Sequence, residues 1–133
     1  MKIVTKDWLN SAQSDLDVII KIAGIDYLTH QTAFHCQQAV EKSFKAIIEE
    51  YEIGFIKTHD LEVLLEKGKE HIDFEINHNY IRKLNNIYLT ARYPADLGLM
   101  PNGKPSLEEA SEFVKFSKII YLKVKEMLER ERK

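Results

Sequence analysis

Residues 29–52, THQTAFHCQQAVEKSFKAIIEEYE, form the longest uninterrupted helical pattern in the chain and hold its most distinctive side chains. At about 100° per residue, the hydrophobic residues of this stretch fall on one broad stripe: Ala33, Phe34, Val40, Phe44, Ile47, Ile48 and Tyr51. The opposite face carries His35, Gln38, Lys42, Lys45 and Glu49. We therefore predict an amphipathic helix against which the rest of the chain packs.

Two features of this helix depart from a simple two-sided pattern. Gln37 lies inside the hydrophobic stripe, where a buried amide must find hydrogen-bond partners or cost a few kcal/mol. We expect it to fix the helix register through such bonds. A third sector carries small side chains that allow close helix approach: Cys36, Ala39, Ser43 and Ala46. This sector is either a second packing face or a seam between two copies of the chain.

The charged residues of the same stretch have a simple interpretation. Glu41, Lys45 and Glu49 stand four residues apart, which brings them together on one helix face. We interpret them as i,i+4 ion pairs of the charged face, each worth a few tenths of a kcal/mol.

The composition indicates one globular domain over residues 1–133, with room for a single core. No apolar run approaches the ~18 residues needed to cross a bilayer, and the start lacks a signal-peptide core. We therefore expect a cytoplasmic protein without membrane association. The 19 basic and 21 acidic residues leave a net charge of −2, which argues against a dedicated nucleic-acid binder. The single cysteine, Cys36, excludes an internal disulfide and is expected to pack rather than react.

Capping residues and periodicity predict the elements on either side of the central helix. A first helix runs over residues 5–23, with Thr5 as its cap and Gly24 as its stop. A connection over residues 25–28 is short enough to make the two helices antiparallel. A short helix opens at Thr58 and ends before Gly68, and residues 69–74 are expected to form a loop.

Two long helices complete the prediction. One covers residues 75–92 and ends before Pro94, and the last begins at Ser106, where Ser106 and Glu109 fit a capping box. Residues 93–105 contain three prolines and two glycines, and form either a functional loop or one anchored by Leu97, Leu99 and Met100. No strand-like alternation occurs. The fold class is all-α: an up-and-down helical bundle of four long helices plus one short helix.

Familiar catalytic and metal-binding motifs are missing. The chain has no phosphate loop, dinucleotide fingerprint or zinc-protease helix motif. Its five histidines are His30, His35, His59, His71 and His78. None forms a same-face pair with another histidine at i+3 or i+4, so we expect neither a metal site nor a cofactor.

Three polar motifs are left over once packing is accounted for: FHCQQAVEK at residues 34–42, KTHDL at 57–61 and ARYP at 91–94. In this order and at these separations they resemble the HEPN family (higher eukaryotes and prokaryotes nucleotide-binding), in its prokaryotic stand-alone branch. The resemblance spans about residues 8–121. It implies a helical bundle that forms homodimers and acts beside a small nucleotidyltransferase, often as a toxin–antitoxin pair.

Many members of that family are metal-independent ribonucleases, with a histidine four to six residues after an arginine near the end of the penultimate long helix. This chain departs from the pattern. The positions four to six after Arg92 are Asp96, Leu97 and Gly98, and those after Arg82 are Asn86, Ile87 and Tyr88. No general acid or base therefore follows the arginine. A ribonuclease acting on RNA is the alternative only if a distant histidine, His35 or His59, takes that role.

Our leading hypothesis is a nucleotide-binding or interaction module. Lys42, Lys57 and Arg92 would bind the phosphates of ATP or GTP. Gln38 and His59 would be polar supports, and His35 would join them from the edge between the polar and small-residue sectors. Tyr93, which a partner enzyme could reach, is a candidate acceptor of a nucleotidyl group.

Each of these residues also has a purely structural interpretation. Arg92 could satisfy only the last carbonyls of its helix, Tyr93 and Pro94 could serve only to end it, and His59 could extend the Thr58 cap. If every motif serves the fold alone, the chain is a structural dimerisation module. The nucleotide-binding hypothesis requires instead that the polar residues converge in one groove.

Overall fold

The described chain is almost entirely helical. The computed structural model describes residues 1–92 and 104–130, and of residues 88–92 only the helical backbone. In chain order the helices are α1 (Ile3–Ile22), α2 (Thr29–Glu50), α3 (Leu61–Gly68), α4 (His78–Arg92) and α5 (Leu107–Arg130), with single 3-10 turns at Asp26–Leu28 and Lys69–His71. Because these residues contain no strand, the predicted all-α class is confirmed.

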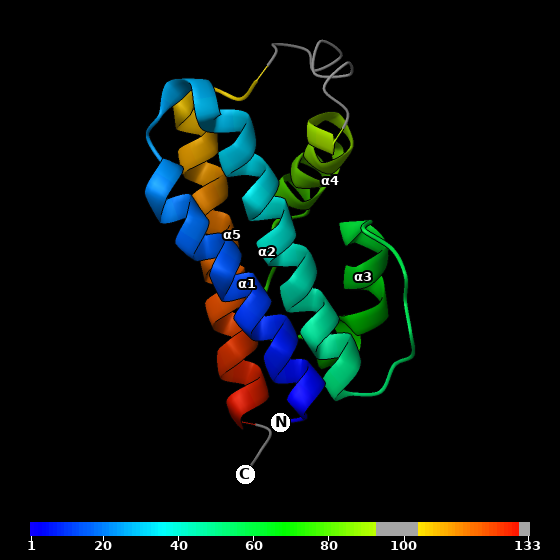
Figure 1. The fold of residues 1–133 in the computed structure, drawn as a ribbon. Helices are drawn as coiled ribbons and strands as arrows, with labels where there is room; N and C mark the ends of the chain where they lie inside the picture. Colours follow the sequence, from blue (N-terminus) through cyan, green and yellow to red (C-terminus); the bar gives the residue numbers. More distant parts are fainter. Residues whose placement is uncertain (93–103, 131–133) are drawn as a thin grey trace.

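The helices form an up-and-down bundle with α2 at its centre (Figure 1). Helix α1 rises from the N-terminus and α2 returns beside it, while α4 rises on the other side of α2 and α5 descends to the end where α1 begins. Helix α2 contacts α1, α3, α4 and α5. The prediction that the chain packs around this helix is therefore confirmed.

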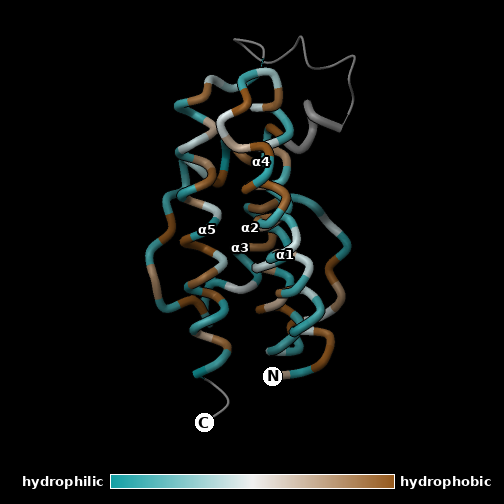
Figure 2. Tube along the Cα trace, turned by 60° about the vertical axis from the view of Figure 1, so that its left-hand side comes forward, coloured by the Kyte–Doolittle hydropathy of each residue, from teal (hydrophilic) through white to brown (hydrophobic). Residues whose placement is uncertain are grey.

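The buried hydrophobic residues form one connected cluster to which all five helices contribute. Figure 2 shows hydrophobic and hydrophilic residues alternating along the helices, as amphipathic helices require. The largest hydrophobic side chains of the cluster that solvent hardly reaches are Phe44, Ile47, Leu61, Leu64, Ile81, Leu84, Ile120, Met127 and Leu128.

The small-residue sector of α2 is a packing face within the chain. Cys36, Ala39, Ser43 and Ala46 are each 0% exposed. Cys36 hydrogen-bonds with Ser117 of α5, so α5 packs against this sector at Cys36. Burial raises the pKa of the Cys36 thiol to about 12, which keeps it protonated and unreactive at neutral pH.

The predicted start of the first helix is wrong. Helix α1 begins at Ile3, and Thr5 lies inside its first turn instead of capping it. The Thr5 side chain is fully buried, and its hydroxyl donates to Glu50 Oε1 at 2.9 Å, near the end of α2. A tertiary hydrogen bond has therefore replaced the expected local cap.

The predicted start of the short helix is also wrong. Helix α3 begins at Leu61, because the Asp60 carboxylate accepts the backbone N–H groups of Glu62 and Val63. The Thr58 hydroxyl accepts only the N–H of Asp60, at 3.2 Å. His59 therefore does not extend a Thr58 cap.

Helix α4 starts three residues later than predicted. The side chain of Asn77 accepts the N–H groups of Asn79 and Tyr80 and so caps the helix. Ile76 precedes this cap and packs against the core from a segment without regular helix. Ile76 fitted the helical spacing of the hydrophobic residues because a single residue can reach the core from a helix or from a non-helical segment.

Most of the predicted loop over residues 93–105 lies outside the described residues, including Leu97, Leu99 and Met100. Its described end is attached to the start of α2. The Thr29 hydroxyl donates to the Pro105 carbonyl at 2.6 Å, and Lys104 lies 3.4 Å from Asp26.

The capping box of α5 is confirmed and provides a stability test. Ser106 Oγ accepts the Glu109 N–H, and Glu109 Oε1 accepts the Ser106 N–H, both at 3.0 Å. We expect Ser106→Ala to lower the free energy of unfolding by about 1 kcal/mol, because the first turn of α5 loses its cap. Urea denaturation measures this change. Ser111→Ala, at an exposed site in the same helix, should leave stability unchanged or slightly raised, and equal losses for both variants would contradict the cap.

Candidate functional site

A polar seam runs along α2, between α1 on one side and the segment before α3 on the other. We define it by Asp15, His35, Gln37, Gln38, Glu41, Lys42, Lys45 and His59. At its centre lie the side chains of Asp15 and Glu41, which are only 9% and 4% exposed. A carboxylate removed from water to this extent must be paired and hydrogen-bonded, or it costs several kcal/mol.

Asp15 binds two side chains of α2 across the α1–α2 contact. His35 Nδ1 donates to Asp15 Oδ1 at 2.8 Å, and Lys42 Nζ donates to Oδ2 at 2.7 Å. His35 and Lys42 are seven residues apart, and two helical turns place them on the same face. An ionised carboxylate only accepts hydrogen bonds, so the Nδ1 proton points toward Asp15. Nε2 is then the ring nitrogen of His35 that can contact a ligand.

Glu41 forms a second group of the same kind. Lys45 Nζ donates to Glu41 Oε2 at 2.9 Å, and His59 Nδ1 lies 3.0 Å from both carboxylate oxygens. The amide of Gln38 adds a longer bond, at 3.5 Å. Each buried carboxylate thus holds one imidazole and one ammonium group, and the His59 side chain is 50% exposed.

Gln37 connects α2 to the segment before α3. Its side chain is 0% exposed, and its amide nitrogen donates to Glu41 Oε1 and to the His59 carbonyl, both at 3.3 Å. Its amide oxygen accepts Gln38 Nε2 at 2.7 Å. The prediction that this buried amide is satisfied by hydrogen bonds is confirmed.

Our interpretation of Glu41 as part of an ordinary charged face is wrong. The i,i+4 bond to Lys45 exists, but the Glu41 side chain is buried and also binds His59. The hydrophobic stripe of α2 is covered on both flanks, so a residue at its edge is enclosed. Glu41 stands four residues after Gln37 and three before Phe44, and this spacing was the signal that could have identified its burial.

Asp15 was missed for a related reason. It stands three residues after Ala12 and four before Ile19, which places it on the hydrophobic face of α1. An acidic residue at such a position is seldom buried without a partner. The spacing could have indicated a buried charge, but its partners lie 20 and 27 residues away on α2.

The segment that carries His59 is fixed from a second side by α4. Asn85 Nδ2 donates to Asp60 Oδ1, and Asn85 Oδ1 accepts the Leu61 N–H, both at 2.8 Å. The hydrogen bond from Asn85, followed by those from the backbone of α3, lowers the pKa of the Asp60 carboxyl. No pattern in the sequence indicated this role of Asn85, because its partners are 24 and 25 residues away.

The structure brings together four of the predicted ligand residues: His35, Gln38, Lys42 and His59. Lys57 is exposed on the same segment as His59, two residues earlier, and its side chain forms no hydrogen bond or ion pair with the described residues. Arg92 ends α4, but its side chain and the whole of Tyr93 lie outside the described residues.

Within residues 1–87 and 104–130, no three His, Cys, Asp or Glu side chains converge as metal ligands would. None of the described helices is long and apolar enough to span a bilayer.

The Asp15 contacts provide a test of the seam. Asp15→Asn removes the negative charge that both His35 and Lys42 contact, and we expect a loss of about 2 kcal/mol or more in the free energy of unfolding. Asp17→Asn is the matched control, because Asp17 is exposed in the same helix and accepts only from Gln13. It should change stability by less than about 0.5 kcal/mol in the same urea denaturation. Similar effects of the two substitutions would contradict a structural role for Asp15.

Comparison with protein families places the whole seam inside one recognised domain. The family model described as HEPN domain matches residues 5–127, which confirms the resemblance drawn from the three motifs. No curated protein matches the chain, and no solved structure does.

Proposed function

The chain belongs to the HEPN domain family, and from this premise we propose that it binds a nucleotide through the polar seam. The observation that supports the proposal is the convergence of His35, Gln38, Lys42 and His59, from two motifs, around two buried carboxylates. Lys57 lies two residues before His59, but its side chain makes no described contact with the seam residues, so the proposal does not rest on it.

The seam has the donors that a phosphate group needs. A lysine ammonium has three N–H donors, so Lys42 and Lys45 retain donors after binding their carboxylates. Because these bonds already restrict the side chains, binding a ligand costs less conformational entropy. The two carboxylates also balance the two lysine charges, so we expect positioned donors to contribute more than net positive charge, and the affinity to be modest.

Calorimetric titration with ATP and with GTP tests the proposal. We expect saturable heat with at least one nucleotide, and a roughly tenfold weaker affinity for His59→Ala and for Lys42→Gln. Lys42→Gln loses an ammonium donor, and His59→Ala loses an imidazole whose doubly protonated form can donate to phosphate. Lys125→Ala is the control, since Lys125 is exposed on α5 and should not affect binding. No heat with either nucleotide would contradict the proposal.

The structural alternative makes the opposite prediction in the same experiment. If the motifs serve only the fold, the His59 and Lys42 variants would melt at lower temperature while the unaltered chain would bind neither nucleotide. A circular-dichroism melt of each variant therefore accompanies the titration, and affinities are compared only where the variant is folded.

The ribonuclease alternative needs an arginine beside one of the two histidines. The arginines with described side chains, Arg82 and Arg130, donate to Asn79 at 2.6 Å and to Asp73 at 2.8 Å. The two remaining arginines, Arg92 and Arg132, have no described side chain. The described contacts thus give this alternative no support, and nucleotide binding is the function that we propose.

We also propose that the module is a homodimer that acts with a small nucleotidyltransferase in a toxin–antitoxin pair, and that Tyr93 accepts a nucleotidyl group from that enzyme. Incubation with the product of the adjacent gene, ATP and Mg²⁺ should raise the mass of the chain by one adenylyl group, because the Tyr93 hydroxyl attacks the α-phosphate of ATP and displaces pyrophosphate. Tyr93→Phe should remove this gain, whereas Tyr27→Phe, at an exposed site before α2, should keep it. An unmodified natural chain would overturn the assignment of Tyr93.

A further inference from the structure

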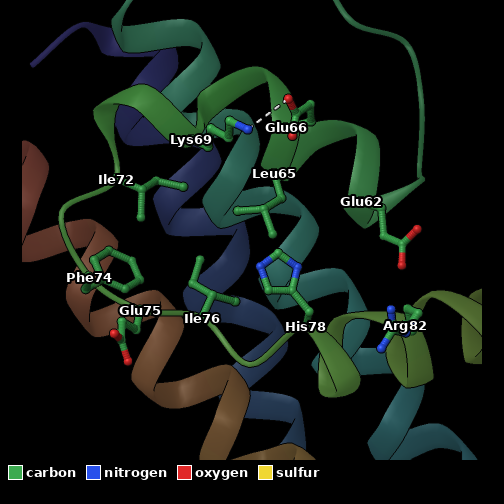
Figure 3. Close-up of a pocket in the computed structure, with 10 residues that line it drawn as sticks. All are labelled: Glu62, Leu65, Glu66, Lys69, Ile72, Phe74, Glu75, Ile76, His78 and Arg82. Atoms are coloured by element: carbon green, nitrogen blue, oxygen red, sulfur yellow. Dashed lines mark ion pairs between the residues drawn. The ribbon is translucent and has the colours of Figure 1, made fainter.

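A pocket of about 650 Å³ lies between α3, the segment over residues 72–76 and the first two turns of α4 (Figure 3). Its hydrophobic lining consists of Leu65, Ile72, Phe74 and Ile76. Its volume is in the range of pockets that enclose ligand groups. No residue of the polar seam lines it, so it is a separate site.

The rim of this pocket carries an excess of negative charge. Glu62, Glu66 and Glu75 oppose two cations, Lys69 and Arg82, which leaves one carboxylate unbalanced when the rim histidine is counted as neutral. Lys69 pairs with Glu66 at 3.1 Å. The carboxylates of Glu62 and Glu75 form no hydrogen bond or ion pair with the described residues, and Figure 3 shows them toward opposite margins of the pocket. The pocket therefore suits a hydrophobic group accompanied by a positive charge.

The chain itself carries such a group. Phe55 lies between α2 and α3 and is 92% exposed, more than any other large hydrophobic side chain among the described residues. The preceding Gly54 has a φ of +132°, a conformation that a residue with a Cβ rarely adopts. Lys57, two residues on, is an exposed cation without a described partner. Residues 54–57 thus present an exposed aromatic ring and an exposed ammonium group on one short loop.

We propose that the Phe55–Lys57 loop of a second copy of the chain docks into this pocket, and that the second copy's pocket receives the loop of the first. Phe55 would cover the hydrophobic lining, and Lys57 would neutralise the unbalanced rim carboxylate. Burying a phenylalanine side chain is worth about 1.5–3 kcal/mol. The proposal gives the homodimer of the proposed function a contact surface and does not depend on nucleotide binding.

A reciprocal exchange suits the positions of the two features. The loop leads into the N-terminus of α3, and Glu62, Leu65 and Glu66 of the same helix line the pocket. In a two-fold arrangement each copy supplies one loop and one pocket, so every contact forms twice and the assembly closes at two chains. A single anchor on each side is a small interface, and we expect a weak dimer.

Sedimentation of the full chain over a range of concentrations tests the proposed anchor. The natural chain should reach a dimer and no larger species. Phe55→Ala should weaken the dimer at least tenfold, because the anchor is lost at both contacts. Tyr27→Ala is the control, since Tyr27 is 70% exposed and lies away from the loop and the pocket.

A charge exchange tests the pairing of loop and pocket. Lys57→Glu in one chain, and Glu62→Lys with Glu75→Lys in another, should each give a mainly monomeric protein, because each homodimer places like charges together. An equal mixture should dimerise again, because one contact is then natural and the other has both charges exchanged. All three positions are exposed, so folding should be unaffected.

A natural chain that stays monomeric, Phe55→Ala dimers as stable as the natural ones, or a mixture no tighter than its components would each overturn the proposal. If Phe55→Ala forms dimers as stable as those of the natural chain, the contact between copies lies elsewhere, for example in the hydrophobic groove between Ile20 of α1 and Leu122 of α5. Titration of Phe55→Ala with ATP and GTP separates this result from the proposed function, since nucleotide binding at the seam should not change.

Discussion

Two carboxylates enclosed by helices, Asp15 and Glu41, impose the constraint on which the polar part of this HEPN domain depends. Moving an ionised carboxylate out of water costs several kcal/mol even in a relaxed protein. That cost is comparable with the whole stability of a domain of this size, about 5–15 kcal/mol. Each carboxylate must therefore be neutralised in place, and the positions of His35, Lys42 and Lys45 on α2 follow from this requirement.

The same constraint links fold and function. Asp15 joins α1 to α2, and Glu41 joins α2 to the segment before α3, so the pairs that neutralise charge also hold three parts of the chain together. They direct each imidazole through Nδ1, and in His35 they leave Nε2 as the ring nitrogen that can contact a ligand. A phosphate group would meet donors whose positions are already determined, and not a set of free surface lysines.

The sequence predicted most of the features that arise from neighbouring residues. The helical period identified α2, and its hydrophobic stripe identified Gln37 as a polar exception. The Ser106–Glu109 spacing identified the capping box that the structure contains. Prediction failed where distant residues decide the outcome. The Thr5 hydroxyl bonds to Glu50, 45 residues away, instead of capping its own helix.

The candidate site follows the same division. Two of the three motifs indicated which polar residues of α2 and the following segment to expect together, because helical spacing places His35, Gln38 and Lys42 on one face. The motifs did not indicate the carboxylates at the centre. Asp15 lies outside all three, and Glu41, although inside the first, matched a local ion pair equally well.

The orientation of the two imidazoles tests this account most directly. Two-dimensional NMR that correlates the ring nitrogens with the carbon-bound ring protons identifies which nitrogen carries the proton in neutral histidine. The account predicts that in the folded chain at alkaline pH both His35 and His59 are protonated at Nδ1, and that Asp15→Asn changes the signals of His35 but not those of His59. Protonation of both rings at Nε2 would contradict the claim that buried carboxylates organise the seam.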